Sequence, residues 1–524
     1  MKKLSLCAYW SILIIVIAFS VYRSHWKTPD KVFHDDINHY YSYLPATFIH
    51  HDLSLNFIKK DINEFAKHYW PIVGPKGDWV IVTTMGLSIL YAPFFLIIHY
   101  PLEWTGQSSL GFTEPYQLAL ILSSLFYVAI GLHLLRKILL AHFSQTTTAI
   151  TIIGVVLATN LLYYVVDEPA MSHAYNFALI TAFVYFTMKW HKSPGIAVSI
   201  WLGLLAGLIT LIRPTNVLVI VVFAFWGITS LKDLNAKFSL FYRKYYLVLF
   251  MVIAAFFIWL PQFIYWKYTT GQYLFFSYGD KGKFFFTNPQ ILNTLFSYRK
   301  GWFLYTPIMI TAIAGLYFLF RRHRGVFIPV LIFMVANIWV ISSWWLWWYG
   351  GSYGLRAYID SYSIAALPFA ALVSWAFDNR KKWIQVVTLI LLSAFIFHNF
   401  FQIEQYRRGA IDYVSMTREA YWESFGKIKP SERFYHLLSY PDYKSAEKGI
   451  YPDPVIDPLY TGKLTRKEGI ERMKEHISSS PEYLEMIRKK SAEQGISFDS
   501  MLYLDARYIY DLKVSEGTIK PSDP

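Results

Sequence analysis

LCAYWSILIIVIAFSVY, residues 6–22, is an uninterrupted apolar stretch of the length that a membrane crossing requires. A helix of roughly 20 apolar residues spans the hydrocarbon core of a bilayer. MKK at residues 1–3 could open a signal peptide, but RSHW at residues 23–26 offers no small-residue cleavage site. We therefore predict an uncleaved first membrane helix.

Apolar segments of similar length recur as far as residue 402. Hydrophobic residues make up 55% of the 524-residue chain, and charged residues make up only 16%, against roughly 25% in soluble domains. We predict an all-α, polytopic integral membrane protein with about 11–13 transmembrane helices. The further segments are 116–135, 148–166, 173–190, 196–212, 215–231, 245–266, 303–320, 326–346, 357–377 and 383–402.

The net charge of +14 could indicate a nucleic-acid partner, but much of it lies in short clusters between the apolar segments. Cytoplasmic loops are enriched in Lys and Arg, so these clusters set the orientation and no nucleic acid is expected. The clusters are Lys2/Lys3, Arg136/Lys137, Lys189/Lys192, Lys232/Lys237/Arg243/Lys244, Arg321/Arg322/Arg324 and Arg380/Lys381/Lys382.

One more apolar stretch, residues 79–100, decides the topology. If it crosses the membrane, Arg136 and every later cluster fall outside; if it does not, all six clusters fall inside. We therefore expect eleven crossings, with 79–100 bent, half-inserted or irregular, because Pro93 permits a break. The outer face then receives the first loop, 23–78, together with the other polar turns that carry candidate site residues.

The chain changes composition at residue 403, which divides it into a transmembrane domain, 1–402, and a polar tail, 403–524. Thr465 and Glu468 have the spacing of a capping box at a helix N-terminus. Ser480-Pro481-Glu482 is typical of a second helix start, and Ser497 of a third. We expect a small, partly helical appendage on the outer face rather than a catalytic domain.

His34-Asp35-Asp36 follows the first apolar segment and contains the candidate catalytic residues, Asp35 and Asp36. Adjacent carboxylates repel each other, but one of them can take a proton from an acceptor hydroxyl. The competing interpretation is a solvated loop in which Asp35 or Asp36 caps a helix. The amphipathic, aromatic stretch 38–48 is suited to a helix lying on the membrane surface.

Asp167, Glu168 and His173 form a second polar cluster between two apolar segments. They could orient the acceptor or support a metal ion; alternatively, they form an acidic turn that starts a helix at Pro169. The histidines of the first loop lack zinc-type spacing with cysteines. No cofactor is assigned, and a divalent metal remains an open alternative.

Three basic residues on the same expected face are candidate phosphate ligands: Arg213, Arg356 and, more weakly, Lys300. The glycines before Arg356 allow the backbone to approach a ligand closely. Trp348, Tyr349 and Tyr353 stand among these glycines, and tryptophans here would lie at the membrane interface whatever the function. The sequence has no Walker loop, G-x-S-x-G or dinucleotide fingerprint, so a nucleotide-consuming mechanism is unsupported.

Taken in order, these features resemble the GT-C superfold of polyprenyl-phosphate-sugar-dependent glycosyltransferases, which includes protein O-mannosyltransferases and the aminoarabinose transferase of lipid A. Asp35-Asp36 is similar to the acidic pair of that family, Asp167 to its second acidic turn, and Arg213 stands where many members have Lys. WYGGSYGLR, residues 348–356, resembles the W-x-G-G-S-x-G-x-R element of many bacterial members. The resemblance of this element implies that the donor or its sugar is contacted by Trp348, Tyr349, Gly350, Gly351 and Tyr353. The tail has no counterpart that we can use.

The resemblance implies an inverting glycosyltransferase that takes a sugar from a polyprenyl phosphate, such as undecaprenyl phosphate, and transfers it to a hydroxyl of a lipid-linked glycan, lipid or protein. It implies a bacterial inner membrane with the active site facing the periplasm, Asp35 as general base, and Asp36 as its support. A transporter or flippase of a lipid-linked or amphipathic solute is the alternative from another class, and an O-antigen ligase or polymerase is a related one.

Overall fold

The computed structural model describes residues 3–107, 110–378 and 381–522; Lys2 and Arg380 of the basic clusters lie outside these ranges. The chain forms two compact units. The helical unit comprises Met1–Phe296, Trp302–Tyr349 and Gly354–Phe400, and the tail unit comprises Ser297–Gly301, Gly350–Tyr353 and Phe401–Pro524. The structure is about 70% helical with almost no strands among the described residues, which is consistent with the all-α fold class.

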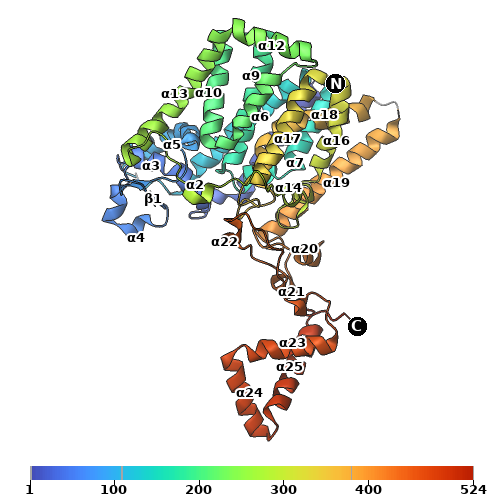
Figure 1. Cartoon of the computed structure of the whole chain (residues 1–524). Helices are drawn as coiled ribbons and strands as arrows, with labels where there is room; N and C mark the ends of the chain where they lie inside the picture. The colour runs from blue at the N-terminus through green and yellow to red at the C-terminus, as the bar shows by residue number, and fades with distance from the viewer. Residues whose placement is uncertain (1–2, 108–109, 379–380, 523–524) are drawn as a thin grey trace. The chain divides into compact units, whose positions relative to one another are not determined.

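The helical unit contains long apolar helices joined by short turns, with one two-stranded hairpin in its first loop (Figure 1). Its elements are α1 (Leu4–Arg23), η1 (His25–Lys27), α2 (Asp35–Tyr41), α3 (Tyr43–Phe48), η2 (Asn56–Lys60), α4 (Ile62–Phe65), β1 (Ile72–Val73), β2 (Trp79–Val80), α5 (Gly86–Trp104), α6 (Glu114–Leu140), α7 (Gln145–Leu157), α8 (Leu161–Val166), α9 (Ser172–Lys192), α10 (Ile196–Ile212), η3 (Pro214–Leu218), α11 (Val219–Phe225), α12 (Leu231–Arg243), α13 (Tyr245–Thr270), η4 (Gly279–Gly282), α14 (Ile291–Phe296), α15 (Trp302–Tyr305), α16 (Ile308–Arg322), α17 (Arg324–Ser343), η5 (Arg356–Ser361), α18 (Tyr362–Asp378) and α19 (Lys382–Arg407), whose last residues belong to the tail unit.

Among the described residues, seven helices are long and apolar enough to cross a membrane, which is compatible with an integral membrane protein. Four predicted segments do not form one continuous α-helix: 148–166 forms α7 and α8, 215–231 begins with η3 before α11, 303–320 is divided between α15 and α16, and 357–377 begins with η5 before α18. At the first interruption, Thr159 donates to the Val155 carbonyl and accepts from Leu161 N. Side-chain bonds of this kind compete with the helix ladder.

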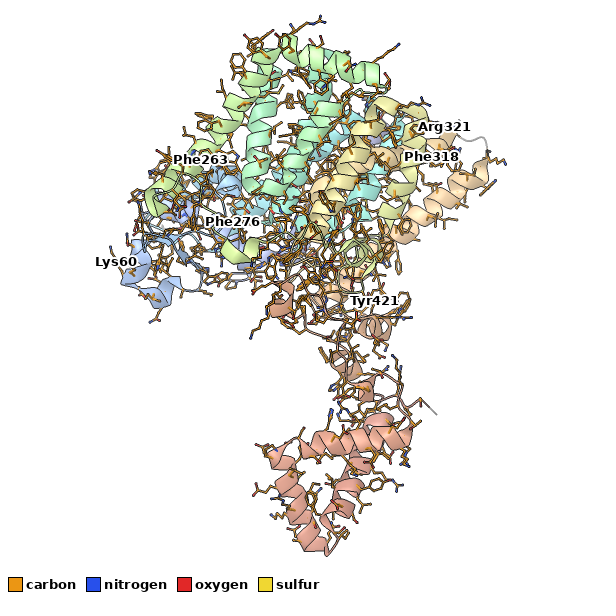
Figure 2. The ribbon with its side chains drawn as sticks, in the orientation of Figure 1. Lys60, Phe263, Phe276, Phe318, Arg321 and Tyr421 are labelled. Atoms are coloured by element: carbon orange, nitrogen blue, oxygen red, sulfur yellow. The ribbon has the colours of Figure 1, made fainter. Side chains whose placement is uncertain are left out.

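The basic clusters gather at one end of the helical unit. Arg136 donates from Nε to Ser5 Oγ at 2.8 Å, which joins the last turns of α6 to the start of α1. The rings of His142, after α6, and His323, before α17, lie 5.4 Å apart. We call this end, which also carries α12 and Arg321 (Figures 1 and 2), the basic end.

The opposite ends of the same helices carry the candidate site residues. Arg23, the last residue of α1, lies 3.4 Å from Asp167, which follows α8. Arg213, directly after α10, lies 3.2 Å from His173 in the first turn of α9. We call this end, where α2 and α3 also lie (Figure 1), the site end.

Helix α5 corrects one detail of the topology prediction. No break occurs at Pro93, and Gly86–Trp104 is one helix. Gly86 packs against Ile212, the last residue of α10, and His99 Nδ1 lies 2.9 Å from the hydroxyl of Tyr116, the third residue of α6. Because α10 ends and α6 begins at the site end, the chain enters and leaves α5 at the same end of the unit.

The aromatic stretch 38–48 forms helices, as predicted, but they are largely buried in the protein. Ile37, Tyr41 and Ala46 have no exposed surface, and Tyr41 donates to the Gly111 carbonyl at 2.6 Å. Helices α2 and α3 pack on α5. The acidic pair at the start of α2 is therefore held in position by the packing of α2 and α3 against the rest of the protein.

The tail unit contains the three helices predicted from its capping signals. Thr465 forms the capping box with Glu468, Ser480 precedes the second helix, and the Ser497 hydroxyl accepts from Ser500 N at the start of the third. The elements of the tail are α20 (Arg418–Ser424), α21 (Glu432–His436), α22 (Tyr443–Ala446), η6 (Pro458–Tyr460), α23 (Arg466–Ser478), α24 (Pro481–Gln494) and α25 (Phe498–Ser515).

Candidate functional site

Asp36 and Arg356 form an ion pair at the site end of the helical unit. Asp36 Oδ2 lies 3.1 Å from Arg356 Nη2, although the two residues are 320 positions apart in the chain. The Asp36 side chain is 45% exposed and the Arg356 side chain 19%, so the carboxylate is open to solvent while the guanidinium is largely enclosed. The pair combines an accessible proton acceptor with a cation that can bind phosphate.

His34 connects the two acidic clusters predicted from the sequence. Its Nδ1 lies 3.3 Å from Asp35 Oδ2, and its Nε2 lies 3.0 Å from Glu168 Oε2. Burial lowers the pKa of His34, but the bonds to Asp35 and Glu168 outweigh burial and raise that pKa to about 9. His34 is therefore an imidazolium at neutral pH, and its hydrogen bond lowers the pKa of Asp35.

Asp35 differs from its neighbour in exposure and in backbone conformation. Its side chain is 86% exposed, and its φ of 43° is in the left-handed region that residues other than glycine rarely adopt. His34, the N-cap of α2, makes no side-chain cap bond. Asp35 bonds to His34, and Asp36 bonds to Arg356. The capping interpretation of the acidic pair therefore gains no support.

Asp167 and Glu168 have different partners. Asp167 Oδ1 lies 3.4 Å from Arg23 Nε and 3.2 Å from His25 Nε2, which fixes the end of α1. Glu168 accepts from the Tyr163 hydroxyl at 3.3 Å and pairs with His34. Helix α9 begins at Ser172, so the predicted helix start at Pro169 is wrong.

Asp360 is a functional candidate that the sequence reasoning missed. It is 2% exposed, and its Oδ2 accepts from Asn176 Nδ2 at 3.1 Å and from Asn216 Nδ2 at 2.8 Å. Arg213 Nη1 lies 3.5 Å from the same oxygen, and His173 Nδ1 lies 2.9 Å from Oδ1. Asp360 therefore holds Arg213 and His173 in place. A carboxylate at the start of an apolar segment was the available signal.

The W-x-G-G-S-x-G-x-R element is divided between the two units. The Arg213 guanidinium lies over the ring of Tyr349, 5.9 Å from its centre, and Tyr349 has a φ of 58°. Trp348 is buried, with its ring 5.5 Å from that of Trp347. Strained backbone at two residues of one site, Asp35 and Tyr349, is a common property of functional sites.

The other predicted contacts of this element belong to the tail unit. Gly351 packs closely on the ring of Tyr413, and the buried ring of Tyr353 lies 5.4 Å from that of Tyr406. Gly350, with a φ of 69°, opens the tail unit's segment. Lys300 is buried there, and its ammonium donates to the carbonyls of Ser352 and Tyr413. These bonds give Lys300 a role in holding the tail unit together.

The described residues contain no group of three or more His, Cys, Asp or Glu side chains arranged to hold a metal ion. What they bring together is a set of ion pairs: Asp36 with Arg356, His34 with Asp35 and Glu168, and Arg213 with Asp360. Such a set can accept a proton and stabilise a phosphate.

No protein-family model matches this chain, and no curated protein sequence matches it. The function must therefore be argued from the site itself.

Proposed function

We propose that this protein is an inverting membrane glycosyltransferase that transfers a sugar from a polyprenyl-phosphate donor to an acceptor hydroxyl at the site end. The observation that carries the proposal is the Asp36–Arg356 pair, in which an accessible carboxylate lies 3.1 Å from a largely enclosed guanidinium. In an inverting displacement the base and the phosphate ligand lie on opposite faces of the attacked carbon, so the donor would enter between Asp36 and Arg356 and separate the pair.

The apolar helices support a lipid-linked donor. Polyprenyl phosphate carries its charge at the end of a hydrocarbon chain, and a site at the ends of membrane helices can receive both parts. We propose eleven crossings, with α5 remaining at the site end, so that the basic end faces the cytoplasm and the site end faces the periplasm of a bacterial inner membrane.

In the proposed reaction, the acceptor oxygen bonds to the anomeric carbon while the bond from that carbon to the phosphate oxygen breaks. The acceptor proton passes to a carboxylate, and the lipid phosphate leaves with the bonding electron pair. Arg356 and Arg213 stabilise the negative charge that grows on the phosphate. Each arginine is paired with a different carboxylate: Arg356 with Asp36, and Arg213 with Asp360.

We assign the proton transfer to Asp36, whereas the sequence analysis expects Asp35 as the base. Asp36 adjoins Arg356, so it lies beside the expected phosphate. Asp35 is more exposed, and the hydrogen bond from the imidazolium of His34, which lowers its pKa, occupies its carboxylate. Asp35 and Glu168 then hold His34, and Asp35 orients the acceptor.

The test compares Asp36→Asn with Asp35→Asn in purified, reconstituted protein. The donor and acceptor would first be identified from the lipids that copurify and from the glycans lost in a deletion strain, both by mass spectrometry. A general base contributes roughly 10²–10⁴-fold, so Asp36→Asn should reduce turnover by at least about a hundredfold, and Asp35→Asn by less. Both variants should remain folded, which their thermal unfolding measures.

Near-normal turnover in Asp36→Asn would refute its role as the base, and a loss confined to Asp35→Asn would restore the assignment expected from the sequence. Movement of an intact lipid-linked solute across vesicles without covalent transfer would instead establish a flippase. A diphosphate-linked donor would indicate chemistry of the O-antigen ligase type.

A further inference from the structure

Helix α12, at the basic end, exposes a narrow apolar ridge. Leu231, Phe238 and Tyr242 are 80%, 63% and 83% exposed. Their spacing of seven and four residues places them on one face of a helix. Exposed aromatic and aliphatic side chains aligned in this way need a covering surface.

The helix is held on the helical unit by one edge. The ring of Phe241 lies 5.6 Å from that of Phe223 and 5.8 Å from that of Trp190. Lys237 Nζ donates to the Trp226 carbonyl at 2.6 Å. These contacts fix the rotation of α12, so its apolar ridge stays directed away from the protein.

The segment around α12 is basic. Residues 229–246 contain four basic side chains, Lys232, Lys237, Arg243 and Lys244, and one acidic side chain, Asp233. Asp233 accepts from the backbone N and the hydroxyl of Thr229, at 2.9 and 2.6 Å, so its charge is used to close the turn before the helix. The remaining charge favours an anionic partner.

Helix α13 follows α12 directly and runs down from the basic end in Figure 1. Only 17% of the most apolar stretch of α13 is buried in the protein. Its exposed side chains include Leu249, Val252, Ile253, Phe256 and Phe257. A surface this apolar and this long is suited to contact with lipid, and α12 adjoins it in the chain.

We propose that α12 is a binding site for anionic phospholipid, with its apolar ridge among the acyl chains and its basic side chains on the headgroups. The combination of an apolar ridge and a basic polar face is typical of helices that lie in a membrane interface. This binding is independent of the proposed sugar transfer, because α12 and the candidate site lie at opposite ends of the helical unit.

The experiment uses the full-length protein in nanodiscs that contain equal amounts of phosphatidylglycerol and phosphatidylcholine. Cys7 is the single cysteine, so Cys7→Ser removes it, and Phe238→Cys then carries a fluorophore on the ridge. Ala236→Cys carries the same fluorophore on the exposed polar face. One lipid at a time is brominated, and quenching reports which lipid lies beside each position.

We expect brominated phosphatidylglycerol to quench position 238 several-fold more than brominated phosphatidylcholine, with little quenching at position 236. Each basic residue near an anionic surface is worth roughly fivefold in affinity. Neutralising three of them, Lys232→Gln, Arg243→Gln and Lys244→Gln together, should therefore abolish this preference.

The matched control neutralises three exposed lysines of the tail unit, Lys463→Gln, Lys467→Gln and Lys489→Gln, and should leave the preference unchanged. Equal quenching by both lipids would overturn the proposal, as would the absence of quenching at position 238. Fluorophore self-quenching that appears only in discs with two protein copies would identify a second copy as the occupant and would overturn it as well.

Discussion

At the scale of single residues, His34 is a side chain of the site end whose charge depends on pH. Its pKa of about 9 lies above the ordinary value of 6.5 because Asp35 and Glu168 stabilise its charged form. Its contribution to stability is therefore complete below pH 6.5 and is lost as the pH rises to about 9. We expect transfer to decline over the same range.

The measurement is the pH profile of turnover. His34→Gln should remove the alkaline decline, and Glu168→Gln should move it to lower pH because one of the two anions that stabilise the imidazolium is gone. An alkaline decline that is the same in wild type and His34→Gln would show that another group causes it.

Asp360 offers a second prediction at the same scale, because it is the buried partner of Arg213. Breaking a buried ion pair from one side costs about 3–5 kcal/mol, since the remaining charge loses its partner. Asp360→Asn should therefore lower the unfolding temperature and weaken donor binding. The double variant Asp360→Asn, Arg213→Gln should be more stable than Asp360→Asn alone, measured by thermal unfolding in detergent.

If Arg213→Gln lowers the unfolding temperature as much in the Asp360→Asn background as in the wild type, the two side chains act independently. In that case Asp360 would be a core residue of the helix junction without a positioning role.

The sequence could supply the candidate residues but not their pairing. Asp36 and Arg356 were recognised by residue type and expected side, and their contact across 320 positions came from the structure. Asp360 is missed because a single carboxylate at the start of an apolar segment is the only sequence signal for it. By residue type alone, the basic residue Lys300 could not be distinguished from Arg356, nor Gly351 from Gly354. Yet Lys300 and Gly351 belong to the tail unit, and Arg356 and Gly354 to the helical unit.

At the scale of elements, local signals predicted the helices well and long-range packing altered their ends. The tail helices α23, α24 and α25 begin where Thr465, Ser480 and Ser497 predict. The helix α5 continues through Pro93, because its buried side chains, including Tyr91 and Phe95, compensate for the hydrogen bond that proline removes.

The N-cap residues of α23 and α24, Thr465 and Ser480, make a matched comparison. The Thr465 hydroxyl accepts from Glu468 N, whereas Ser480 makes no side-chain cap bond. Thr465→Ala should destabilise α23 by about 1 kcal/mol, and Ser480→Ala should have a much smaller effect on α24.

Hydrogen exchange of the full-length protein measures both helices at once, with about fivefold faster exchange expected in the first turns of α23 for Thr465→Ala. Equal effects of the two substitutions would mean that the cap bond of Thr465 contributes nothing.

At the scale of the whole molecule, the separation of the basic end from the site end leads to a prediction of orientation. With Cys7→Ser as background, a membrane-impermeant maleimide should label a cysteine introduced at Lys60 in intact cells. Cysteines introduced at Lys137 and Arg321 should be labelled only after permeabilisation, because Lys- and Arg-rich turns remain in the cytoplasm. Outside labelling at both 137 and 321 would contradict this orientation.

Charge balance at the site end has a consequence for how a donor arrives. Four cations, Arg23, His34, Arg213 and Arg356, face five carboxylates, Asp35, Asp36, Asp167, Glu168 and Asp360, most of them already in ion pairs. Paired charges project little field beyond a few ångströms, so long-range steering of an anion from solution is weak. Encounter would be governed by two-dimensional diffusion of the lipid, and its rate would depend on bilayer fluidity more than on ionic strength.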